Sequence, residues 1–575
     1  MGNSDDRRPY LTALVLNQAF LDNSQDNLVN QLEFVVEIEG PTGTLYFSDR
    51  NKYVGDTFYE ARITLPLMKR TVGEWLSNII EFQDLTFEIN NADEQFNPIL
   101  PGGADFDGWA GRRITFKMGL RDVAATYVSL FSGLVTHEGG FKRTVKSFSL
   151  TARDDFEKIN QSFPFTIFTD TAFPDIEPSL VNTFIPVVYG DWTVDMEPGF
   201  ASIPAIVVNG GDEDVNGDVS NTTNVQLVIS EHDNVSFDSA NVYLKRGDKG
   251  WLIDSGDINT IVGNRTFQIT QASGTMTAVT PDTDDDILEY STGDEFFVRM
   301  KGKDLGAYDD NIVAIARDIL ETFGGVLPAS FDSNWDTYRD KASPAVSAIA
   351  TFKARAHIRE PQNALDFALS LLEQVRLEAF VDRNLKLKIL PLHLEDFDPS
   401  PTHKIRNWDI EKDSFRPQID ERNNFNRAKA VYNLLPNRNE NFSETVIYKN
   451  QAAIDQQGGQ KVSKKIIYPN LYDLTVVQNQ LIETMRLASS YLEHIYTSLT
   501  WRSLLLDIGD FVALDVKIQS SQYDESPALV REIGYDPIGV KLPVRLWSFQ
   551  MTPFPGWSPG YSGITGGSTA TIEED

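Results

Sequence analysis

Residues 31 to 40 read Gln-Leu-Glu-Phe-Val-Val-Glu-Ile-Glu-Gly and contain a strand pattern. Apolar side chains alternate with acidic ones, the apolar set being Leu32, Phe34, Val36 and Ile38 and the acidic set Glu33, Glu37 and Glu39. Because successive side chains of a strand point to opposite faces, this pattern predicts a strand with one buried face. Val35 interrupts the alternation, and Gly40-Pro41 marks its end.

Short strands of the same kind follow along the next 120 or so residues. They are predicted over residues 61–65, 85–89, 113–118, 127–131 and 148–152, with turn-rich segments such as Pro101-Gly102-Gly103 between them. Aromatic residues make up 11% of the chain, which also favours strands. We therefore predict one β domain over residues 25–160, preceded by an N-terminal arm over residues 1–24.

Residues 205–305 differ in composition, because Asn, Asp, Thr, Ser and Gly dominate there. Strands are predicted over residues 225–229, 240–244 and 267–269, which indicates an acidic β-rich insertion. Residues 161–204 are then a linker between the first domain and this insertion. Tyr243, Trp251 and Phe267 could stack on sugars if they are exposed, although aromatic side chains in strands more often fill a core.

Helical patterns begin only after residue 306. Asp309-Asp310 is predicted to cap a helix whose apolar stripe runs from Ile312 to Phe323, and Gly324-Gly325 ends it. Pro361 suits the first turn of a second helix, which leads into a hairpin of residues 379–381 and 385–389. These elements predict an α+β middle domain over residues 306–400.

The last part of the chain combines one long helix with further strands. Apolar residues at helical spacing predict a helix from Leu474 to Tyr496, and strands resume at Trp501. Residues 401–558 therefore form a second β-rich domain with a long helix, and residues 559–575 form a flexible C-terminal tail rich in Gly, Ser and Thr. The predicted fold class is α+β, a β-rich multidomain chain.

The composition excludes several classes of protein. The 575 residues contain 51 Lys and Arg against 83 Asp and Glu, a net charge of −32, so a surface that grips nucleic acid phosphates is disfavoured. The chain has no cysteine, which excludes disulfide scaffolds, thiol nucleophiles and cysteine-held metal clusters. No apolar run reaches the length of a membrane span, and the polar start lacks a signal peptide, so we expect no membrane span and a protein that is made and folded in the cytoplasm.

Catalytic motifs are poorly supported. The one G-x-S-x-G match, Gly556 to Gly560, opens a Gly-rich tail with no helix after it and no histidine downstream. The six histidines stand singly, without metal-ligand spacing: His137, His232, His357, His393, His403 and His494. We therefore predict no enzyme activity, no catalytic residue and no cofactor.

One segment resembles the start of a calcium-binding loop. Residues 212–217 match the pattern D-x-[DN]-x-[DN]-G, which makes Asp212, Asp214, Asn216 and Asp218 candidate calcium ligands. The twelfth position is Thr223 where the loop has a bidentate acid, so a solvated acidic turn is the favoured interpretation.

Several segments, in this order, resemble the hub or tail-tip proteins of long-tailed bacteriophages and related phage-like particles. Five segments resemble parts of the first barrel domain of that family: residues 85–91, 96–98, 112–118, 131–135 and 150–154. The segment Ile185-Pro186-Val187-Val188-Tyr189-Gly190 resembles the family's link to the middle region. The middle block is resembled by the helix of residues 312–323 with residues 332–338, and by the helix after Pro361 with its hairpin. The second barrel is resembled by residues 420–424, 428–432, 506–512 and 529–533, with Ile508 where a proline is common.

This resemblance implies two barrel-like β domains of the tail-hub type, over residues 25–160 and 401–558. Three copies would form a ring at the distal end of a tail tube, adapting the six-fold tube to a three-fold tip and gating release of the genome and the tape measure protein. The implied location is the tail tip of the virion, with assembly in the host cytoplasm. The implied partners are further copies in a trimer, the distal tail or tube protein, the tape measure protein, and the tip fibre or spike proteins. DNA would pass through the lumen without specific binding, and an acidic lining would keep it from adsorbing.

Two alternatives remain open on the sequence. The Asn- and Thr-rich insertion also suits a receptor-binding component, and the many acidic residues leave room for a carbohydrate-active tail component.

Overall fold

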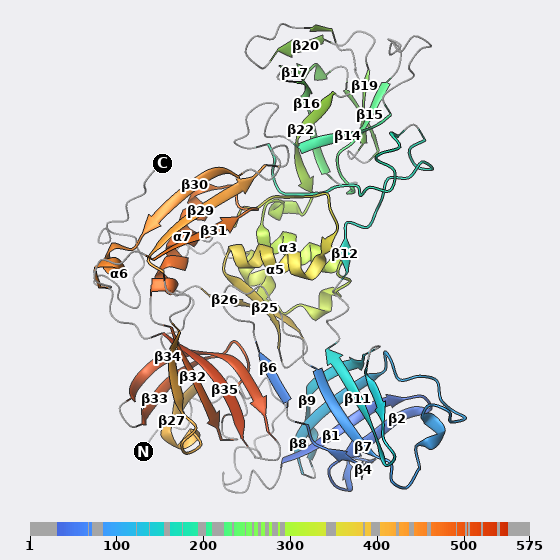
Figure 1. Ribbon diagram of the computed structural model, residues 1–575, viewed down its shortest axis with the longest axis vertical. Helices are drawn as coiled ribbons and strands as arrows, with labels where there is room; N and C mark the ends of the chain where they lie inside the picture. The colour runs from blue at the N-terminus through green and yellow to red at the C-terminus, as the bar shows by residue number, and fades with distance from the viewer. Residues whose placement is uncertain are drawn as a thin grey trace.

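The computed structural model separates the molecule into two β domains at one end, a helical middle region and a further β unit at the other end (Figure 1). Described here are residues 32–66, 68–71, 84–121, 123–136, 139–154, 161–174, 176–193, 203–209, 224–232, 235–247, 249–255, 258–262, 266–270, 275–278, 286–287, 294–340, 352–382, 386–392, 403–420, 425–435, 442–456, 462–489, 492–500, 503, 506–518, 521–536 and 541–549. The N-terminal arm, the C-terminal tail and the calcium candidates Asp212, Asp214, Asn216 and Asp218 lie outside these ranges. The model confirms a β-rich fold with few helices, built from several separate sheets.

The first sheet contains the predicted strands of the N-terminal domain. Its strand order is β3-β4-β2-β1-β8-β9-β11-β7-β5, with β10 beside β11. The strands are β1 (Leu32–Gly40), β2 (Gly43–Ser48), β3 (Lys52–Val54), β4 (Thr57–Ala61), β5 (Ile63–Thr64), β7 (Asp84–Asn90), β8 (Arg113–Leu120), β9 (Val123–Val135), β10 (Phe141–Arg143) and β11 (Ser147–Asp154). Phe34, Val36 and Ile38 of β1 are buried, as the alternation predicts, and Val35 is buried as well.

The two ends of this sheet meet at Arg62, between β4 and β5. The Arg62 N–H donates to the Ser48 carbonyl of β2 at 3.0 Å, and the Arg62 carbonyl accepts from the N–H of Asn90 in β7 at 2.8 Å. One peptide segment thus bonds to strands at opposite ends of the strand order.

The unit at the top of Figure 1 is the predicted insertion, and its strands form a second sheet. Its strand order is β18-β19-β15-β14-β22-β16-β17-β20-β21. The strands are β14 (Ile203–Asn209), β15 (Asn224–Val228), β16 (Val235–Arg246), β17 (Lys249–Ile253), β18 (Ile258–Val262), β19 (Thr266–Thr270), β20 (Thr275–Ala278), β21 (Asp286–Ile287) and β22 (Glu295–Lys303). The predicted strands over residues 240–244 and 267–269 are confirmed as parts of β16 and β19, and the one over residues 225–229 is confirmed up to Val228, where β15 ends.

The middle region packs α3 (Ile312–Thr322) against α5 (Ala364–Gln374), with α4 (Asn334–Arg339) and the hairpin β25 (Leu377–Val381) and β26 (Leu387–Pro391) beside them. The predicted hairpin is confirmed, with Val381 opposite Leu387. Two short pairings bring the preceding segment into this region: β12 (Ser162–Phe163) with β24 (Gln362–Asn363), and β13 (Val187–Tyr189) with β23 (Ala356–Ile358).

The starts of both helices differ from the prediction. Asn311, not Asp309-Asp310, caps α3, because its Oδ1 accepts hydrogen bonds from the N–H groups of Val313 and Ala314. The α5 helix begins at Ala364 with Asn363 as its cap, and not at Pro361, because Gln362 and Asn363 pair with β12 as strand β24. In both cases an asparagine directly before the apolar stripe supplies the side-chain acceptor.

The C-terminal β domain is a sheet of order β27-β33-β34-β35-β32-β28. Its strands are β27 (His403–Arg406), β28 (Arg416–Asp420), β32 (Leu492–Leu499), β33 (Phe511–Ile518), β34 (Ser521–Tyr535) and β35 (Leu542–Phe549). The ends of this sheet also meet through one segment, because residues 409–411 follow β27 and bond to β32. The Glu411 N–H donates to the Ser498 carbonyl at 2.8 Å, and the Asp409 carbonyl accepts from the Thr500 N–H at 2.8 Å.

The predicted long helix is shorter than expected. α7 (Leu474–Ser489) packs on a small sheet of order β30-β29-β31, and the segment from Leu492 onward is strand β32. The small sheet consists of β29 (Arg427–Leu434), β30 (Phe442–Lys449) and β31 (Ser463–Tyr468), and α6 (Gln451–Gln456) follows β30. The prediction of helix to Tyr496 is wrong because Ile495, Tyr496 and Thr497 are β-branched or aromatic and pair across the sheet with β28 and β35, which outweighs the local helical spacing.

The two β domains share one four-strand connectivity. In the first, β7, β8, β9 and β11 follow in chain order and lie in the sheet as β7-β11-β9-β8, with all three pairings antiparallel. In the second, β32, β33, β34 and β35 lie as β32-β35-β34-β33, again all antiparallel. Both arrangements are Greek keys, in which three consecutive strands form a meander and the first strand returns beside the last.

Candidate functional site

A short strand joins the two β domains directly. β6 (Met68–Thr71) follows β5 of the first sheet but pairs antiparallel with the end of β34 in the C-terminal sheet, Met68 opposite Tyr535 and Thr71 opposite Glu532. Figure 1 shows β6 between the two domains, which lie side by side. Backbone hydrogen bonds therefore hold the first domain to the second.

Arg70 of β6 fixes this crossing with its side chain. The side chain is almost fully buried, and its guanidinium forms an ion pair with Asp507 at 2.8 Å. It also donates a hydrogen bond to the carbonyl of Val381, at the end of β25. One arginine thus contacts the second β domain and the middle region from a strand that belongs to the first.

A second arginine lies at the same junction. Arg531 of β34 is fully buried, forms an ion pair with Glu378 of β25, and places its guanidinium 3.8 Å from the centre of the Trp547 ring. A buried guanidinium requires such partners, because an unpaired charge in the protein interior is strongly unfavourable. The Glu378 contact therefore ties the middle hairpin to the second sheet.

The hairpin also packs closely on the turn before β33. Gly509 has a positive φ of +83°, and a Cβ atom at this position would lie 2.9 Å from the Phe380 ring. Asp510 Oδ2 accepts a hydrogen bond from the Asp507 N–H at 2.8 Å and holds the turn that presents Asp507 to Arg70. Only glycine combines this backbone conformation with so close an approach.

A further polar cluster connects the β-rich insertion to helix α3. Lys303, at the end of β22, donates to both carboxylate oxygens of Asp318 at 2.8 Å, and the Tyr189 hydroxyl donates to the same carboxylate at 2.6 Å. Burial, together with the Asp318 charge, holds the pKa of Tyr189 well above its usual value. Burial first, and Lys303 second, lower the pKa of the adjacent His232 to about 4, so this imidazole is neutral near neutral pH.

Arg355 forms a third junction near the small C-terminal sheet. The side chain is buried, with its guanidinium 4.5 Å from the Trp192 ring centre and 4.6 Å from that of Tyr472. It also donates a hydrogen bond to Asn433 of β29. Stacking of a guanidinium between two aromatic rings joins three segments that are far apart in the chain.

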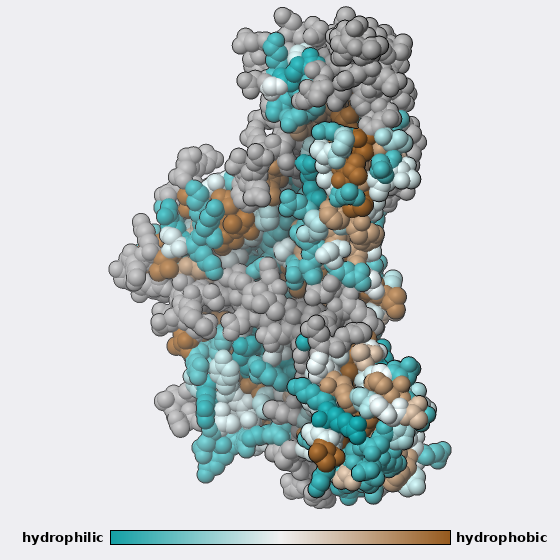
Figure 2. Space-filling view, turned by 45° about the vertical axis from the view of Figure 1, so that its right-hand side comes forward, coloured by the Kyte–Doolittle hydropathy of each residue, from teal (hydrophilic) through white to brown (hydrophobic). Residues whose placement is uncertain are grey.

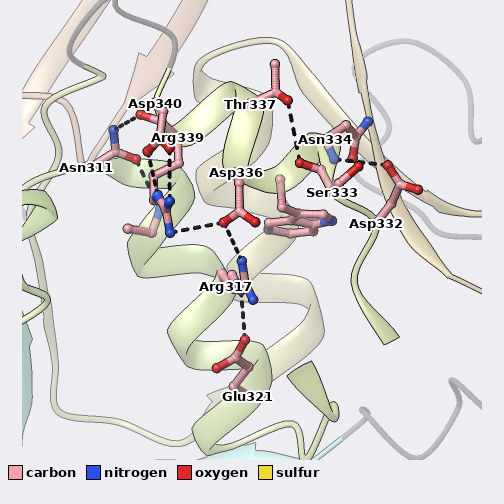
Figure 3. A network of polar contacts seen from close by, with 12 residues as sticks. Asn311, Arg317, Glu321, Asp332, Ser333, Asn334, Asp336, Thr337, Arg339 and Asp340 are labelled. Atoms are coloured by element: carbon pink, nitrogen blue, oxygen red, sulfur yellow. Dashed lines mark hydrogen bonds and ion pairs between the residues drawn. The ribbon is translucent and has the colours of Figure 1, made fainter. Parts of the chain in front are cut away.

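Within the middle region, an ion-pair network braces α3 against α4 (Figure 3). Arg317 contacts Glu321 at 2.7 Å and Asp336 at 2.9 Å, and Arg339 contacts Asp336 at 3.1 Å. Hydrogen bonds from Arg339 and Tyr308 lower the pKa of Asp340 to about 2. The network makes the middle region one body to which the three junctions attach.

The structure does not bring the sequence-predicted candidates together. His232 lies in the insertion, His357 in β23, and His494 in β32 against Trp547. His137, His393 and the Gly556–Gly560 match lie outside the described residues, as do the calcium candidates. Across the ranges given above, no cluster of three or more His, Asp or Glu side chains is arranged to hold a metal ion, and no helix is long and apolar enough to cross a membrane.

Tyr243 and Trp251 of the insertion are each only 3% exposed, so they fill its core and offer no surface for a sugar. Sequence reasoning missed Arg70, Arg531 and Arg355. Their partners lie far away in the chain, Asp507 being 437 residues from Arg70, and no local pattern marks them.

No protein-family model matches the chain, and no curated protein matches it in sequence. Among solved structures, it is similar to the 43 kDa tail protein of prophage MuSo2 from Shewanella oneidensis, with 9% identity, a TM-score of 0.39, and coverage of 90% of this chain and 98% of that one. A tail protein from Neisseria meningitidis MC58 gives 8% identity, a TM-score of 0.38, and coverage of 90% and 97%. A chain from the virion of a native gene transfer agent particle gives 10% identity, a TM-score of 0.38, and coverage of 64% and 85%.

These structural neighbours are therefore tail proteins and a virion particle.

Proposed function

We propose that this chain is a structural protein of a bacteriophage or phage-like virion, and that three copies form a hub ring at the distal end of the tail tube. The ring would join a six-fold tube to a three-fold tip and open to release the tape measure protein and the genome. Its action is mechanical, without catalysis and without a cofactor. The ordered motif resemblance from residue 85 to residue 533 supports this proposal.

The observation that carries the proposal is the shared connectivity of the two β domains. The orders β7-β11-β9-β8 and β32-β35-β34-β33 give one chain two related units, so three copies would present six. A six-fold tube end needs six similar contacts, and a trimer of two-unit chains supplies them while keeping three-fold symmetry elsewhere.

The closure of each sheet supports barrel-like units. Arg62 bonds to β2 and β7 at opposite ends of the first sheet, and residues 409–411 link β27 to β32 in the second. These links remove most of the free edge of each sheet and leave β3 in the first and β28 in the second as edge strands among the described residues.

The charge is distributed unevenly between these units and the rest of the chain. Residues 401–558 contain 18 Lys and Arg against 18 Asp and Glu, and residues 25–160 contain 14 against 20. Residues 161–400 contain 17 against 39 and so carry most of the net charge. The counts therefore favour two ring units that carry little net charge, with the acidic charge in residues 161–400. They give less support to a lumen made acidic by the two ring units.

Tube and tape measure proteins would contact the ring units, and fibre or spike proteins the three-fold side. The alternative of a carbohydrate-active component has less support, because Tyr243 and Trp251 are buried in the core of the insertion. The alternative of a receptor-binding component is decided by deleting the insertion, after which a hub should still form rings.

The test is the oligomeric state and shape of the purified full-length chain. We expect mass photometry to give a trimer, and negative-stain class averages to show a ring with six lobes on one face. Immunogold labelling of particles should place the chain at the distal tail tip. A monomer that forms no ring, or label absent from the tip, would contradict the proposal.

A further inference from the structure

Strand β28 leaves one edge of the second β domain open. It pairs with β32 along one side, and no described residue pairs with its other side. Arg416, Gln418 and Ile419 are all exposed, Ile419 by 53%. An exposed edge strand with an apolar side chain is a template for pairing with another chain.

β28 and β6 hold similar places along the chain, although in the sheet order β28 takes the place of β5, which pairs with β7 as β28 pairs with β32. Each follows the segment that joins the ends of its own sheet, β6 after Arg62 and β5, and β28 after residues 409–411. β6 continues into the neighbouring β domain and pairs with β34. Within one chain, then, the segment after the closing point already serves as a strand that connects two β domains.

The two contacts fall on different sides of the second domain. β34 receives β6, and in the sheet order β35 and β32 separate β34 from β28. In a ring where first and second domains alternate, each second domain has two neighbours. One is the first domain of its own chain, and the other, on a different side of the second domain, is the first domain of the next chain. β28 is placed for that second contact.

The first domain carries a surface that fits β28. β3 is an edge strand, and its hairpin with β4 exposes Tyr53 by 66% and Phe58 by 41%, with ring centres 5.1 Å apart. On the face of this domain that Figure 2 shows, hydrophilic residues are mixed with scattered hydrophobic ones. An exposed aromatic pair indicates a contact surface.

The charges on the two surfaces are complementary. Lys412 precedes β28 and Arg416 is its first residue; both are exposed, and among the described residues neither forms an ion pair, while Asp413 between them is exposed as well. Asp56 is exposed in the turn of the β3–β4 hairpin and likewise has no ion pair among the described residues. Opposite charges across an interface favour the correct partner and speed the encounter.

We propose that β28 docks on the β3–β4 hairpin of a second copy of this chain by strand addition, so that this contact closes the ring. Ile419 would then pack near Tyr53 and Phe58, and Arg416 near Asp56. The inference rests on the proposed ring and names the surfaces that hold one copy to the next.

The absence of cysteine allows a direct test by crosslinking. In an antiparallel register that places Ile419 opposite Tyr53 and Arg416 opposite Asp56, Gln418 lies opposite Val54. The full-length double variant Gln418→Cys/Val54→Cys is treated with a short bis-maleimide and run on a denaturing gel. We expect covalent dimers and trimers, because paired strands bring Cα atoms within about 5.5 Å of each other. Each single variant serves as a control, as does the pair Gln418→Cys/Val145→Cys, since Val145 is 95% exposed in the turn between β10 and β11.

A second variant tests the contact without a crosslinking reagent. Ile419→Lys should shift the wild-type trimer toward monomer in mass photometry, whereas Val145→Lys should leave it unchanged. The inference would be overturned, and the proposed ring left standing, by either of two results in a protein whose wild type is trimeric. One is a Gln418→Cys/Val54→Cys variant that crosslinks no better than the control pair, and the other is an Ile419→Lys variant that remains trimeric. A wild type that is monomeric and forms no ring would overturn both.

Discussion

Arg531 of β34 and Glu378 of β25 form an ion pair in which the arginine side chain is fully buried. The pair joins the middle hairpin to the second β sheet, while the guanidinium also stacks on Trp547. Removing Glu378 would leave this guanidinium buried without its counter-charge.

Glu378→Ala should therefore lower the free energy of unfolding by about 3 kcal/mol or more, the usual range for breaking a buried pair. Differential scanning calorimetry should show the loss as a lower Tm for the transition that includes the second β domain. Glu525→Ala is the matched control, because Glu525 pairs with Lys404 on the surface, where solvent screens the pair and it contributes little to stability. Equal effects of the two changes would contradict a structural role for the Arg531–Glu378 pair.

Gly509→Ala should destabilise the same junction. The positive φ and the 2.9 Å approach of a Cβ atom to Phe380 act together, so we expect a loss of about 2 to 4 kcal/mol by thermal or urea unfolding. Gly306→Ala separates the two causes, because Gly306 also has a positive φ but nothing lies within 4 Å of its Cβ position. Only the backbone cost of about 1 to 2 kcal/mol applies there.

Arg70→Met should loosen the strand that joins the two β domains. The substitution removes the Asp507 ion pair and the hydrogen bond to Val381 but keeps the apolar part of the side chain. Hydrogen exchange should become faster at residues 68–71 and 532–535. The control is Lys69→Met on the same strand, whose ion pair with Glu532 involves a side chain that is 58% exposed; protection there should change little.

We expect the free energy of unfolding to fall in mild acid because of His232. Its pKa is near 4 in the folded protein and about 6.5 when unfolded, so below pH 6.5 the unfolded chain takes up the proton more readily than the folded one. Stability is thus fully present above pH 6.5 and falls toward pH 4, by about 3 kcal/mol for this group.

His232→Leu should remove that part of the pH dependence. The measurement is the difference in unfolding free energy between pH 7 and pH 4.5, compared between wild type and variant, so that the titration of other groups cancels. An identical difference in both proteins would show that His232 does not carry this effect.

Asn311→Ala should cost about 1 kcal/mol, because Asn311 Oδ1 accepts from two N–H groups at the start of α3. Ser333→Ala, at the equivalent position of α4, should cost less, since the Ser333 side chain makes no capping hydrogen bond. Circular dichroism melts of the two variants give the comparison.

The sequence alone determined the β-rich character of the chain and the location of many elements. The alternation around Phe34, the apolar stripe from Ile312 and the hairpin after Leu377 depend on neighbours within a few residues, so a local pattern records them. Prediction from the sequence failed where pairing with a distant strand competes with the local helical preference. Ile495 and Tyr496 fit a helical spacing but form a strand, because β28 and β35 pair with them.

The tertiary structure decided how the parts are joined. The sequence motifs resembled a tail hub, but they did not reveal that β6 leaves its own sheet or that Arg70, Arg531 and Arg355 hold the junctions. Charge pairing and stacking act between atoms a few ångströms apart in space, while Arg70 and Asp507 are 437 residues apart in the chain. Composition and residue spacing do not reveal such a contact, whereas the periodicity of strands and helices can be recognised from neighbouring residues.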